Sequence, residues 1–213
     1  MKVSPFAIGL ILAVAPLGAV SIPITNFSFE APILGTPGGF TATVPGWVTT
    51  GTEAVFQPAV PGQANAVPDG VQVLALGFGG PGSASQDTGV ALDPNTVYTL
   101  GLDVLARNDI GFSTYTVSLF AGATLLATQS TPVVPTPGNF LADILTYTSS
   151  ALPPGGTLTV VLQADGGVAG VGAGQADFDN VTLDAVAGTV PEPSALVLGG
   201  LGLLPLLFFR RRR

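Results

Sequence analysis

The 213-residue sequence contains no cysteine and no histidine. Without cysteine the fold has no disulfide bond to rely on, and cysteine-based nucleophilic catalysis is excluded. Without histidine, Ser-His-Asp catalysis is excluded, and so is every zinc, iron or copper site that uses a histidine ligand. These exclusions are the firmest functional statements that the sequence allows.

Basic residues are scarce as well. Of six Lys and Arg residues, Lys2 lies near the N-terminus and four arginines end the chain, which leaves Arg107. Twelve of the thirteen acidic residues lie between Glu30 and Asp184, so residues 22–189 carry a net charge of −11. A surface of this sign repels phosphate backbones, so we expect no nucleic-acid partner. It suits cations or neutral glycans instead.

The N-terminus has the pattern of a secretory signal peptide. Lys2 supplies a positive charge, residues 6–15 are apolar, and residues 17–21 provide the small side chains of a cleavage site. This order is typical of segments that direct a chain into the secretion machinery and are then removed. We therefore predict a signal peptide over residues 1–21, cleaved near Ala19 to Ser21. A retained N-terminal anchor is the alternative.

The last twenty-four residues, 190–213, have the pattern of a second targeting signal. Pro191 and Pro193 keep the backbone extended, and an apolar run follows before four arginines. Arginines of this kind stay on the cytoplasmic side of a membrane. As a helix with a rise of roughly 1.5 Å per residue, residues 194–209 span only about 24 Å. This is shorter than the roughly 30 Å hydrocarbon core, so the run is a marginal anchor.

This tail resembles the PEP-CTERM sorting signal of bacteria that make exopolysaccharide. The matching residues are Val190, Pro191, Glu192, Pro193, Arg210, Arg211, Arg212 and Arg213. The resemblance implies an exosortase-like processing enzyme as a partner and transient anchoring in the membrane. It also implies a final location in the cell envelope or outside the cell. The alternative is an ordinary C-terminal membrane anchor.

Residues 22–189 are predicted to form one all-β domain. No stretch there sustains a helical period, and turn signals recur every ten residues or so, which favours a β-sandwich. Strands are predicted at residues 24–30, 54–57, 71–76, 84–90, 96–107, 114–120, 124–130, 140–149, 157–164 and 177–187. We therefore predict a jelly-roll sandwich of nine or ten short antiparallel strands, flanked by the signal peptide and a C-terminal apolar helix.

The order of landmarks in this domain resembles the galactose-binding-like β-sandwiches, which include many carbohydrate-binding modules. The landmarks are Asn26 with Phe29 and Glu30, Gly46-Trp47, Asp69-Gly70, Tyr98 to Leu100, and Asp179 to Leu183. The resemblance implies a jelly-roll fold and contact with carbohydrate.

Glu30 and Asp179 are candidate calcium ligands. In the resembled fold the ends of the first and last strands lie close together, and many members hold a structural Ca²⁺ there. Such an ion prefers several oxygen ligands, typically carboxylates with backbone carbonyls, and it would reduce repulsion in an acidic domain. The alternative is two solvated carboxylates at strand ends.

Trp47, Asp177 and Asp179 are the remaining candidates. Trp47 is the single tryptophan; exposed, it would stack on a sugar ring, and buried, it would fill the core. Asp177 and Asp179 share a strand face, and a glycosidase needs two carboxyls about 5 to 9 Å apart. Because this spacing arises by chance in many strands, we predict no catalytic residue.

The predicted function is that of an exported, non-enzymatic module of the cell envelope or extracellular matrix that contacts polysaccharide. One alternative is a structural matrix or adhesion protein without specific glycan binding. The other is a glycan hydrolase.

Overall fold

The protein is an all-β sandwich, as predicted. The computed structural model describes residues 18–167 and 174–188, and Ala19–Gly188 forms one compact unit. Thirteen strands are present in this described part. None of the described residues forms a helix long and apolar enough to cross a membrane. The predicted signal peptide, the C-terminal helix and the sorting residues lie almost wholly outside the described residues.

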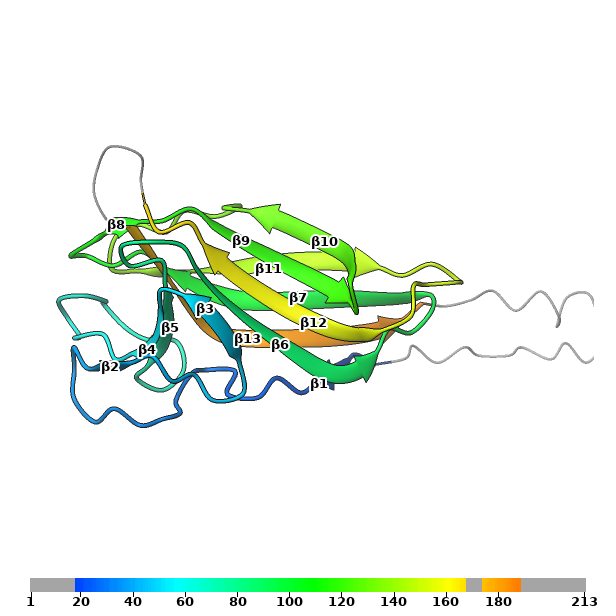
Figure 1. Cartoon of the computed structure of the whole chain (residues 1–213), viewed down its shortest axis with the longest axis horizontal. Helices are drawn as coiled ribbons and strands as arrows, with labels where there is room; N and C mark the ends of the chain where they lie inside the picture. The colour runs from blue at the N-terminus through cyan, green and yellow to red at the C-terminus, as the bar shows by residue number, and fades with distance from the viewer. Residues whose placement is uncertain (1–17, 168–173, 189–213) are drawn as a thin grey trace, which may run out of the picture. The chain divides into compact units, whose positions relative to one another are not determined.

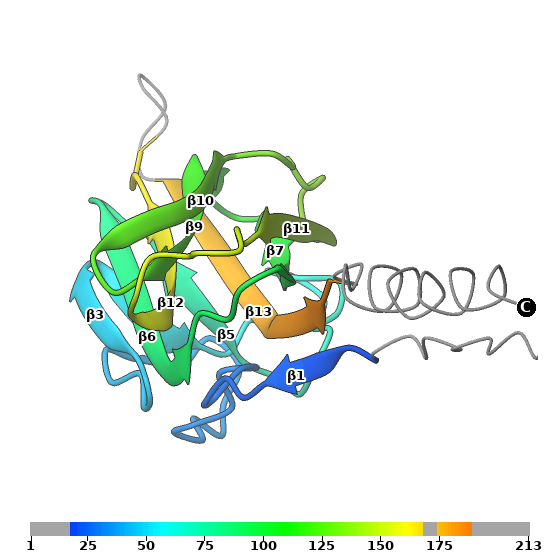
Figure 2. The same cartoon turned by 90° about the vertical axis from the view of Figure 1, so that its right-hand side faces the viewer.

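The strands form two sheets (Figure 1). The eight-stranded sheet has the order β11 (Phe140–Thr148), β7 (Thr96–Leu105), β13 (Gly174–Ala187), β5 (Val73–Leu76), β4 (Glu53–Phe56) and β2 (Phe40–Thr41). In the same sheet, β1 (Val20–Ile22) and β8 (Gly111–Phe112) also pair with β13. The five-stranded sheet has the order β10 (Thr124–Ser130), β9 (Tyr115–Ala121), β12 (Thr157–Ala164), β6 (Gly82–Ala91) and β3 (Val48–Gly51). Neighbouring strands are antiparallel except β8 and β13. Figure 2 shows β1 beside β13.

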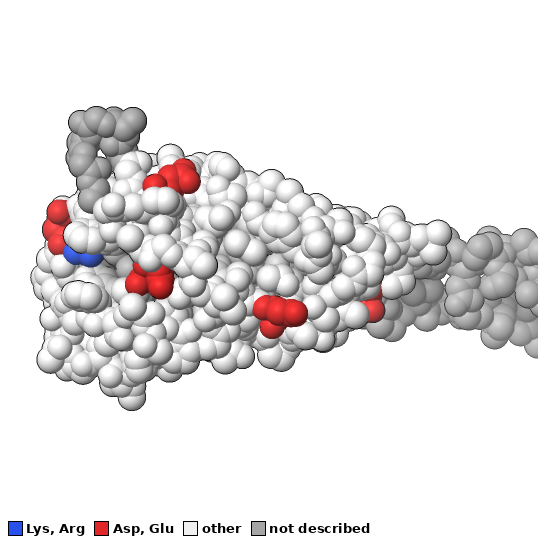
Figure 3. All heavy atoms as spheres, in the orientation of Figure 1, with Lys and Arg blue, Asp and Glu red and all other residues white. Residues whose placement is uncertain are grey.

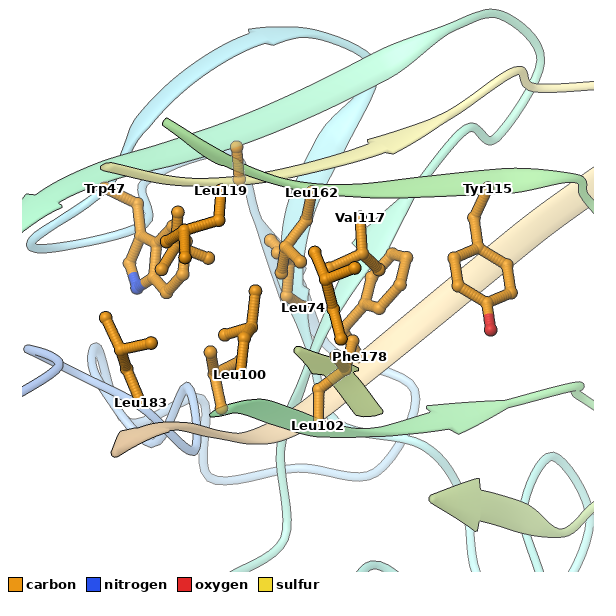
Figure 4. Close-up of a cluster of buried hydrophobic side chains, with 14 of the residues drawn as sticks. Trp47, Leu74, Leu100, Leu102, Tyr115, Val117, Leu119, Leu162, Phe178 and Leu183 are labelled. Atoms are coloured by element: carbon orange, nitrogen blue, oxygen red, sulfur yellow. The ribbon is translucent and has the colours of Figure 1, made fainter. Parts of the chain in front are cut away.

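The main core lies between the two sheets (Figure 4). Strand β7 alternates between faces, so that Leu100 and Leu102 point into the core. Val117 and Leu119 of β9 come from the opposite sheet. Burial of such apolar side chains, at about 25 cal/mol per Å², is the main stabilising contribution to the sandwich.

A buried polar cluster links the sheets along one side. Asp143 of β11 accepts hydrogen bonds from the Tyr115 hydroxyl of β9 at 2.9 Å and from the Gln129 amide of β10 at 2.7 Å. Burial raises the pKa of the Asp143 carboxyl. The Tyr115 ring packs edge-on against Phe178 with 5.6 Å between centroids. Tyr115 and Gln129, the two partners of Asp143, therefore connect strands β9 and β10 of the five-stranded sheet to β11 of the eight-stranded sheet.

The predicted strand at residues 24–30 is wrong. Asn26 and Phe29 have positive φ angles of 52° and 56°, which a strand does not allow. The Asn26 side chain accepts from the Ala31 N–H and donates to the Ala31 carbonyl, both at 3.0 Å, and so holds a turn instead. The first strand, β1, precedes this turn. The other nine predicted strands overlap observed ones, whereas β1, β2, β3 and β8 are additional short strands.

The outer face of the eight-stranded sheet is also covered at one end. Phe56, Val73 and Ala75 form a second buried cluster there, separate from the main core, with Val67 and Phe140 packed against it. The loop between β4 and β5 is held over this face because the Asn65 N–H donates to the Gly138 carbonyl at 2.7 Å. Side chains on both faces of β13 are consequently out of water, and the polar ones on its outer face need partners.

Candidate active site

A cavity of about 470 Å³ opens at this covered end of the eight-stranded sheet. It is lined mainly by apolar side chains and by a few polar ones. The lining residues are Gly38, Phe40, Ala42, Gly51, Thr52, Glu53, Ala54, Phe56, Gln63, Ala75, Phe78, Arg107 and Gln175. This size and this mixture are typical of sites for small organic molecules.

Three phenylalanines give the cavity an aromatic wall. Phe56 is buried and belongs to the floor, whereas Phe40 and Phe78 are 74% and 64% exposed. Large aromatic side chains that remain exposed beside a cavity offer flat surface to a ligand. Phe78 follows β5 in the glycine-rich loop 77–81, and Phe40 belongs to the short strand β2. Neither was predicted as a site residue.

Arg107 is the basic residue among those that line the cavity, and Glu53 is the acidic one. The Arg107 guanidinium lies 4.5 Å from the centre of the Phe56 ring and pairs with Asp109, with Nη2 to Oδ2 at 2.6 Å and Nε to Oδ1 at 2.8 Å. The hydrogen bonds from Arg107 lower the pKa of Asp109. Gln63, from the covering loop, donates to Asp109 as well, at 2.9 Å. The side chain of Arg107 is only 11% exposed, so this single cation is held in place.

Asp177 lies directly behind the cavity. In the register of the sheet, Asp177 pairs with Ala75 of β5, which lines the cavity. Asp177 also lies two positions after Gln175, another lining residue, and therefore on the same face of β13. The Asp177 side chain is fully buried. The Gln175 amide donates to its Oδ1, whereas Oδ2 has no hydrogen-bond partner among the described residues.

The environment of Asp177 favours its protonated form. Burial raises the pKa of its carboxyl to about 7, although the hydrogen bond from Gln175 and the positive charge of Arg107 act in the opposite direction. An unpaired buried carboxylate is costly, so the group takes up a proton instead. A carboxyl with a pKa near neutrality beside an aromatic cavity is equipped to act as a general acid.

The two predicted calcium ligands, Glu30 and Asp179, accept hydrogen bonds from backbone N–H groups of the same loop, which joins β4 to β5. Oε1 of Glu30 accepts from the N–H groups of Val71 and Gln72, both at 2.7 Å. Oδ2 of Asp179 accepts from the N–H of Asp69 at 3.1 Å. A Cβ atom at Gly70 would lie 2.3 Å from the Glu30 carboxylate, so only glycine fits between them. The structure therefore brings Glu30 and Asp179 to the same loop.

Asp179 resembles Asp177 in its burial but not in its partners. It is fully buried, and both its carboxylate oxygens accept hydrogen bonds, Oδ1 from the Asn180 N–H at 2.7 Å. Burial raises the pKa of Asp179 to about 7. Across residues 18–167 and 174–188, no group of three or more His, Cys, Asp or Glu side chains is arranged to hold a metal ion. A cation between Glu30 and Asp179 would depend on backbone oxygens for its other ligands.

Trp47 lies in the core of the sandwich. Its side chain is 7% exposed, its ring packs 5.4 Å from that of Phe29, and its Nε1 donates to the Thr25 carbonyl at 3.1 Å. Its indole ring is therefore not available on the surface.

Figure 3 shows that acidic side chains on one face lie apart from one another, with the basic side chain (blue) beside acidic ones (red) in one place. The surface offers no broad patch of one charge on that face.

The comparisons with known proteins identify relatives of a different kind from those predicted. The model of the HpiC1-like family, described as HpiC1 cyclase, matches residues 20–184. A Stig cyclase from Fischerella sp. TAU, solved with (3Z)-3-(1-methyl-2-pyrrolidinylidene)-3H-indole, is 28% identical with a TM-score of 0.70. That match covers 81% of this chain and 100% of the other.

Two further solved structures extend the comparison. A cyclase from the same organism, solved with 4-(1H-indol-3-yl)butan-2-one, is 27% identical, with a TM-score of 0.68 over 80% of this chain and 100% of the other. An α-L-arabinofuranosidase is 21% identical, with a TM-score of 0.51 over 78% of this chain and 26% of the other, and shows the fold alone. Comparison with curated proteins finds no match.

These findings overturn the predicted function. The predictions of a non-catalytic polysaccharide-contacting module and of a chain that is not an enzyme are wrong, because the family and the similar structures are cyclases. The resemblance to carbohydrate-binding sandwiches holds for the fold and not for the ligand. The comparisons give no support to a PEP-CTERM signal, an exosortase partner or a cell-envelope role, and the family match ends before residue 190.

The pKa values of Asp177 and Asp179 predict that stability falls as pH rises. Both groups have a pKa of about 7 in the folded protein and an ordinary value of 3.8 when unfolded. The folded state therefore binds more protons between these values, and the stability that each proton contributes is lost as pH rises through about 7. In metal-free buffer, we expect the free energy of unfolding to fall by about 1 kcal/mol per pH unit for each group between about pH 5 and 7.

Urea unfolding at a series of pH values measures this slope. The Asp177→Asn and Asp179→Asn variants should each flatten it, whereas Asp93→Asn, at an exposed turn, should not. A free energy of unfolding that stays constant or rises between pH 5 and 7 would show that neither carboxyl is protonated in the folded protein.

Proposed function

Because the chain belongs to the HpiC1-like cyclase family, we propose that it is a cyclase that closes a ring in a small aromatic substrate, with Asp177 as the general acid. The observation that carries the proposal is the full burial of Asp177, with an unpartnered Oδ2, directly behind an aromatic cavity. Family membership supports the reaction class, and the cavity supports the substrate class.

The substrate is expected to be planar, aromatic and mostly apolar. Phe40, Phe56 and Phe78 offer ring faces, and Ala54 and Ala75 leave room between them. The two similar cyclases were solved with ligands that carry an indole or indole-like ring. An electron-rich ring of this class fits a cavity of about 470 Å³, and it accepts a proton on carbon more readily than a plain hydrocarbon ring.

The proposed reaction is a net isomerisation. The Asp177 carboxyl gives its proton to an electron-rich carbon of the substrate, whose π electrons form the new C–H bond and leave a cation. A second π bond of the substrate attacks this cation and closes the ring through a new C–C bond. Loss of a proton from the cyclised cation restores neutrality and reprotonates Asp177. The phenylalanine faces stabilise the intermediate cations.

Asp177→Asn tests this role. The substitution keeps the shape of the side chain but removes the transferable proton, so we expect kcat to fall by about 10²- to 10⁴-fold. The measurement is turnover of an indole-bearing polyene, followed by the appearance of cyclised product of unchanged mass. Isothermal titration calorimetry of 4-(1H-indol-3-yl)butan-2-one binding checks that the cavity is intact.

Asp143→Asn is the matched control. Asp143 is also buried with a raised pKa, but it lies in the polar cluster between the sheets and not at the cavity. We expect its substitution to lower stability while kcat stays within about twofold of the wild-type value, since it touches no cavity residue. Full activity of Asp177→Asn would refute the assignment of the general acid.

We also propose that Glu30 and Asp179 contribute to a structural Ca²⁺ site. The donors fit: two carboxylates lie at one loop, Asp179 is buried, and hard cations take carboxylate and carbonyl oxygens. The raised pKa of Asp179 marks a carboxylate that lacks a compensating positive charge. A bound cation would supply that charge and hold loop 69–72 over the outer face of the sheet.

Calcium should therefore stabilise the fold. At free Ca²⁺ a hundredfold above its Kd, the free energy of unfolding should rise by about 2.7 kcal/mol. Glu30→Gln and Asp179→Asn should abolish this increase in thermal unfolding experiments, whereas Asp93→Asn should retain it. An increase of the same size in all three variants, or none in the wild type at millimolar Ca²⁺, would contradict the site.

We further propose that the cyclase is exported. Support comes from the sequence of the two ends alone: the signal-peptide pattern of residues 1–21 and the PEP-CTERM-like tail of residues 190–213. In this proposal, the secretion machinery and an exosortase-like enzyme act on segments outside the cyclase domain. The proposed final location is the envelope or the medium, with transient anchoring through the tail.

Fractionation of the producing cell tests export. The full chain should appear as shortened protein outside the cytoplasm, and deletion of residues 2–21 should keep it inside. Deletion of residues 190–213 should change how much is retained or released without changing the turnover of purified protein. Cytoplasmic full-length protein in the wild type would contradict the proposal.

A further inference from the structure

Phe78 is a large aromatic residue that stays mostly in water beside the cavity. Its side chain is 64% exposed, and it lies in the loop 77–81 between Gly77 and Gly79. Both glycines have positive φ angles, of 95° and 79°, which favour glycine over other residues. Because three of the five loop residues are glycines, a fixed position of Phe78 requires contacts from outside the loop.

Thr52 supplies three of those contacts. Its N–H donates to the Pro81 carbonyl at 3.1 Å, and its carbonyl accepts from the Gly77 N–H at 3.0 Å. Its hydroxyl donates to the Gly80 carbonyl. The first and last residues of the loop are thus bound to the backbone of one residue, which itself lines the cavity. The backbone bonds would form with any residue except proline, whereas the third bond requires a side-chain donor such as a hydroxyl at position 52.

Close backbone packing holds the base of the loop from two further sides. A Cβ atom at Gly51 would overlap the Pro81 carbonyl oxygen. A Cβ atom at Gly166 would overlap the carbonyl oxygen of Gly80. At Gly79, by contrast, a Cβ atom would meet nothing within 4 Å. The base of the loop is therefore tightly seated, whereas its tip has free space around it.

This arrangement holds an aromatic ring beside the cavity in a fixed position. An exposed phenylalanine ring gains nothing from contact with water, and a loop that is fixed in advance loses little entropy when a ligand binds. We propose that Phe78 determines specificity for an aromatic substrate, and that Thr52 is the positioning residue that holds it through the hydroxyl bond to Gly80. This inference rests on the proposed aromatic substrate and not on the role of Asp177.

Calorimetric titration of the full chain with 4-(1H-indol-3-yl)butan-2-one tests both roles without turnover. Phe78→Ala removes an exposed ring, so the fold tolerates it, and we expect Kd to rise about tenfold. Thr52→Val keeps the branched shape of the side chain but removes the hydroxyl bond, and we expect Kd to rise roughly three- to tenfold. Thr52→Ser keeps the hydroxyl, so its Kd should stay within about twofold of the wild-type value.

Two matched substitutions elsewhere in the fold supply the controls. Phe27 is also an exposed phenylalanine, with 42% of its side chain in water, but it is not among the residues that line the cavity. The hydroxyl of Thr50 pairs with that of Ser83 at 2.7 Å in the five-stranded sheet, two positions before Thr52. Phe27→Ala and Thr50→Val should both leave Kd within about twofold of the wild-type value, since neither changes loop 77–81.

A double-mutant cycle shows whether Thr52 acts through Phe78. In the Phe78→Ala background, Thr52→Val should have no further effect on Kd, because the ring that Thr52 positions is gone. Hydrogen exchange of the amides of residues 77–80 should become faster in Thr52→Val and stay unchanged in Thr52→Ser, while exchange in strand β7 of the core stays the same in both. A rise in Kd of the same size in both backgrounds would overturn the positioning role.

The outcomes separate this inference from the proposed function. Unchanged Kd values in Phe78→Ala and Thr52→Val overturn it, even if Asp177→Asn is inactive. The expected Kd values together with full activity of Asp177→Asn overturn the general acid and leave this inference standing. A wild-type chain that does not bind the ligand at millimolar concentration overturns the aromatic substrate class and this inference together. If Thr52→Val fails to fold, Thr52→Ala removes the same hydroxyl and decides the question.

Discussion

The burial of β13 on both of its faces is the constraint on which this structure depends. Its inner residues, such as Phe178, pack in the core between the sheets. Its outer residues Gln175, Asp177 and Asp179 are equally out of water, because loops cover that end of the eight-stranded sheet. Polar groups in such a position have to be paired or neutral. Asp179 accepts two backbone N–H groups, whereas Asp177 receives one side-chain hydrogen bond. Burial raises the pKa of both carboxyls to about 7, so the two residues differ in their partners and not in this shift.

The same covering creates the cavity. The loop that carries Gln63 is held above the sheet, and Arg107 lies beneath it over Phe56. Apolar residues on the sheet and aromatic residues on its edge then enclose a space next to the buried acid. In the proposed function, the outer face of the sandwich would supply the proton source and the surface that folds the substrate.

Much of the fold was predictable from the sequence, and little of the site was. The alternation of apolar and polar residues along β7 identifies Leu100 and Leu102 as core residues, because every second side chain of a strand lies on the same face of the sheet. The turn at Asn26 was missed, since its positive φ is held by side-chain bonds that alternation does not reveal. Asp177 was visible as half of an i, i+2 pair, but its burial depends on loops distant in the sequence. The absence of histidine excluded catalytic triads correctly; it does not exclude catalysis by one buried carboxyl. The most informative overlooked signal was Arg107, the single cation of an acidic domain.

The cavity on the outer face of the eight-stranded sheet is the proposed substrate site, and a crystal structure of the full chain with 4-(1H-indol-3-yl)butan-2-one would test this. We expect the indole ring to lie against Phe56, between Phe40 and Phe78, on the side of the cavity lined by Ala75 and Gln175. An indole bound instead in the polar hollow of the five-stranded sheet, near Ser83 and Gln163, would show that the cavity is not the substrate site.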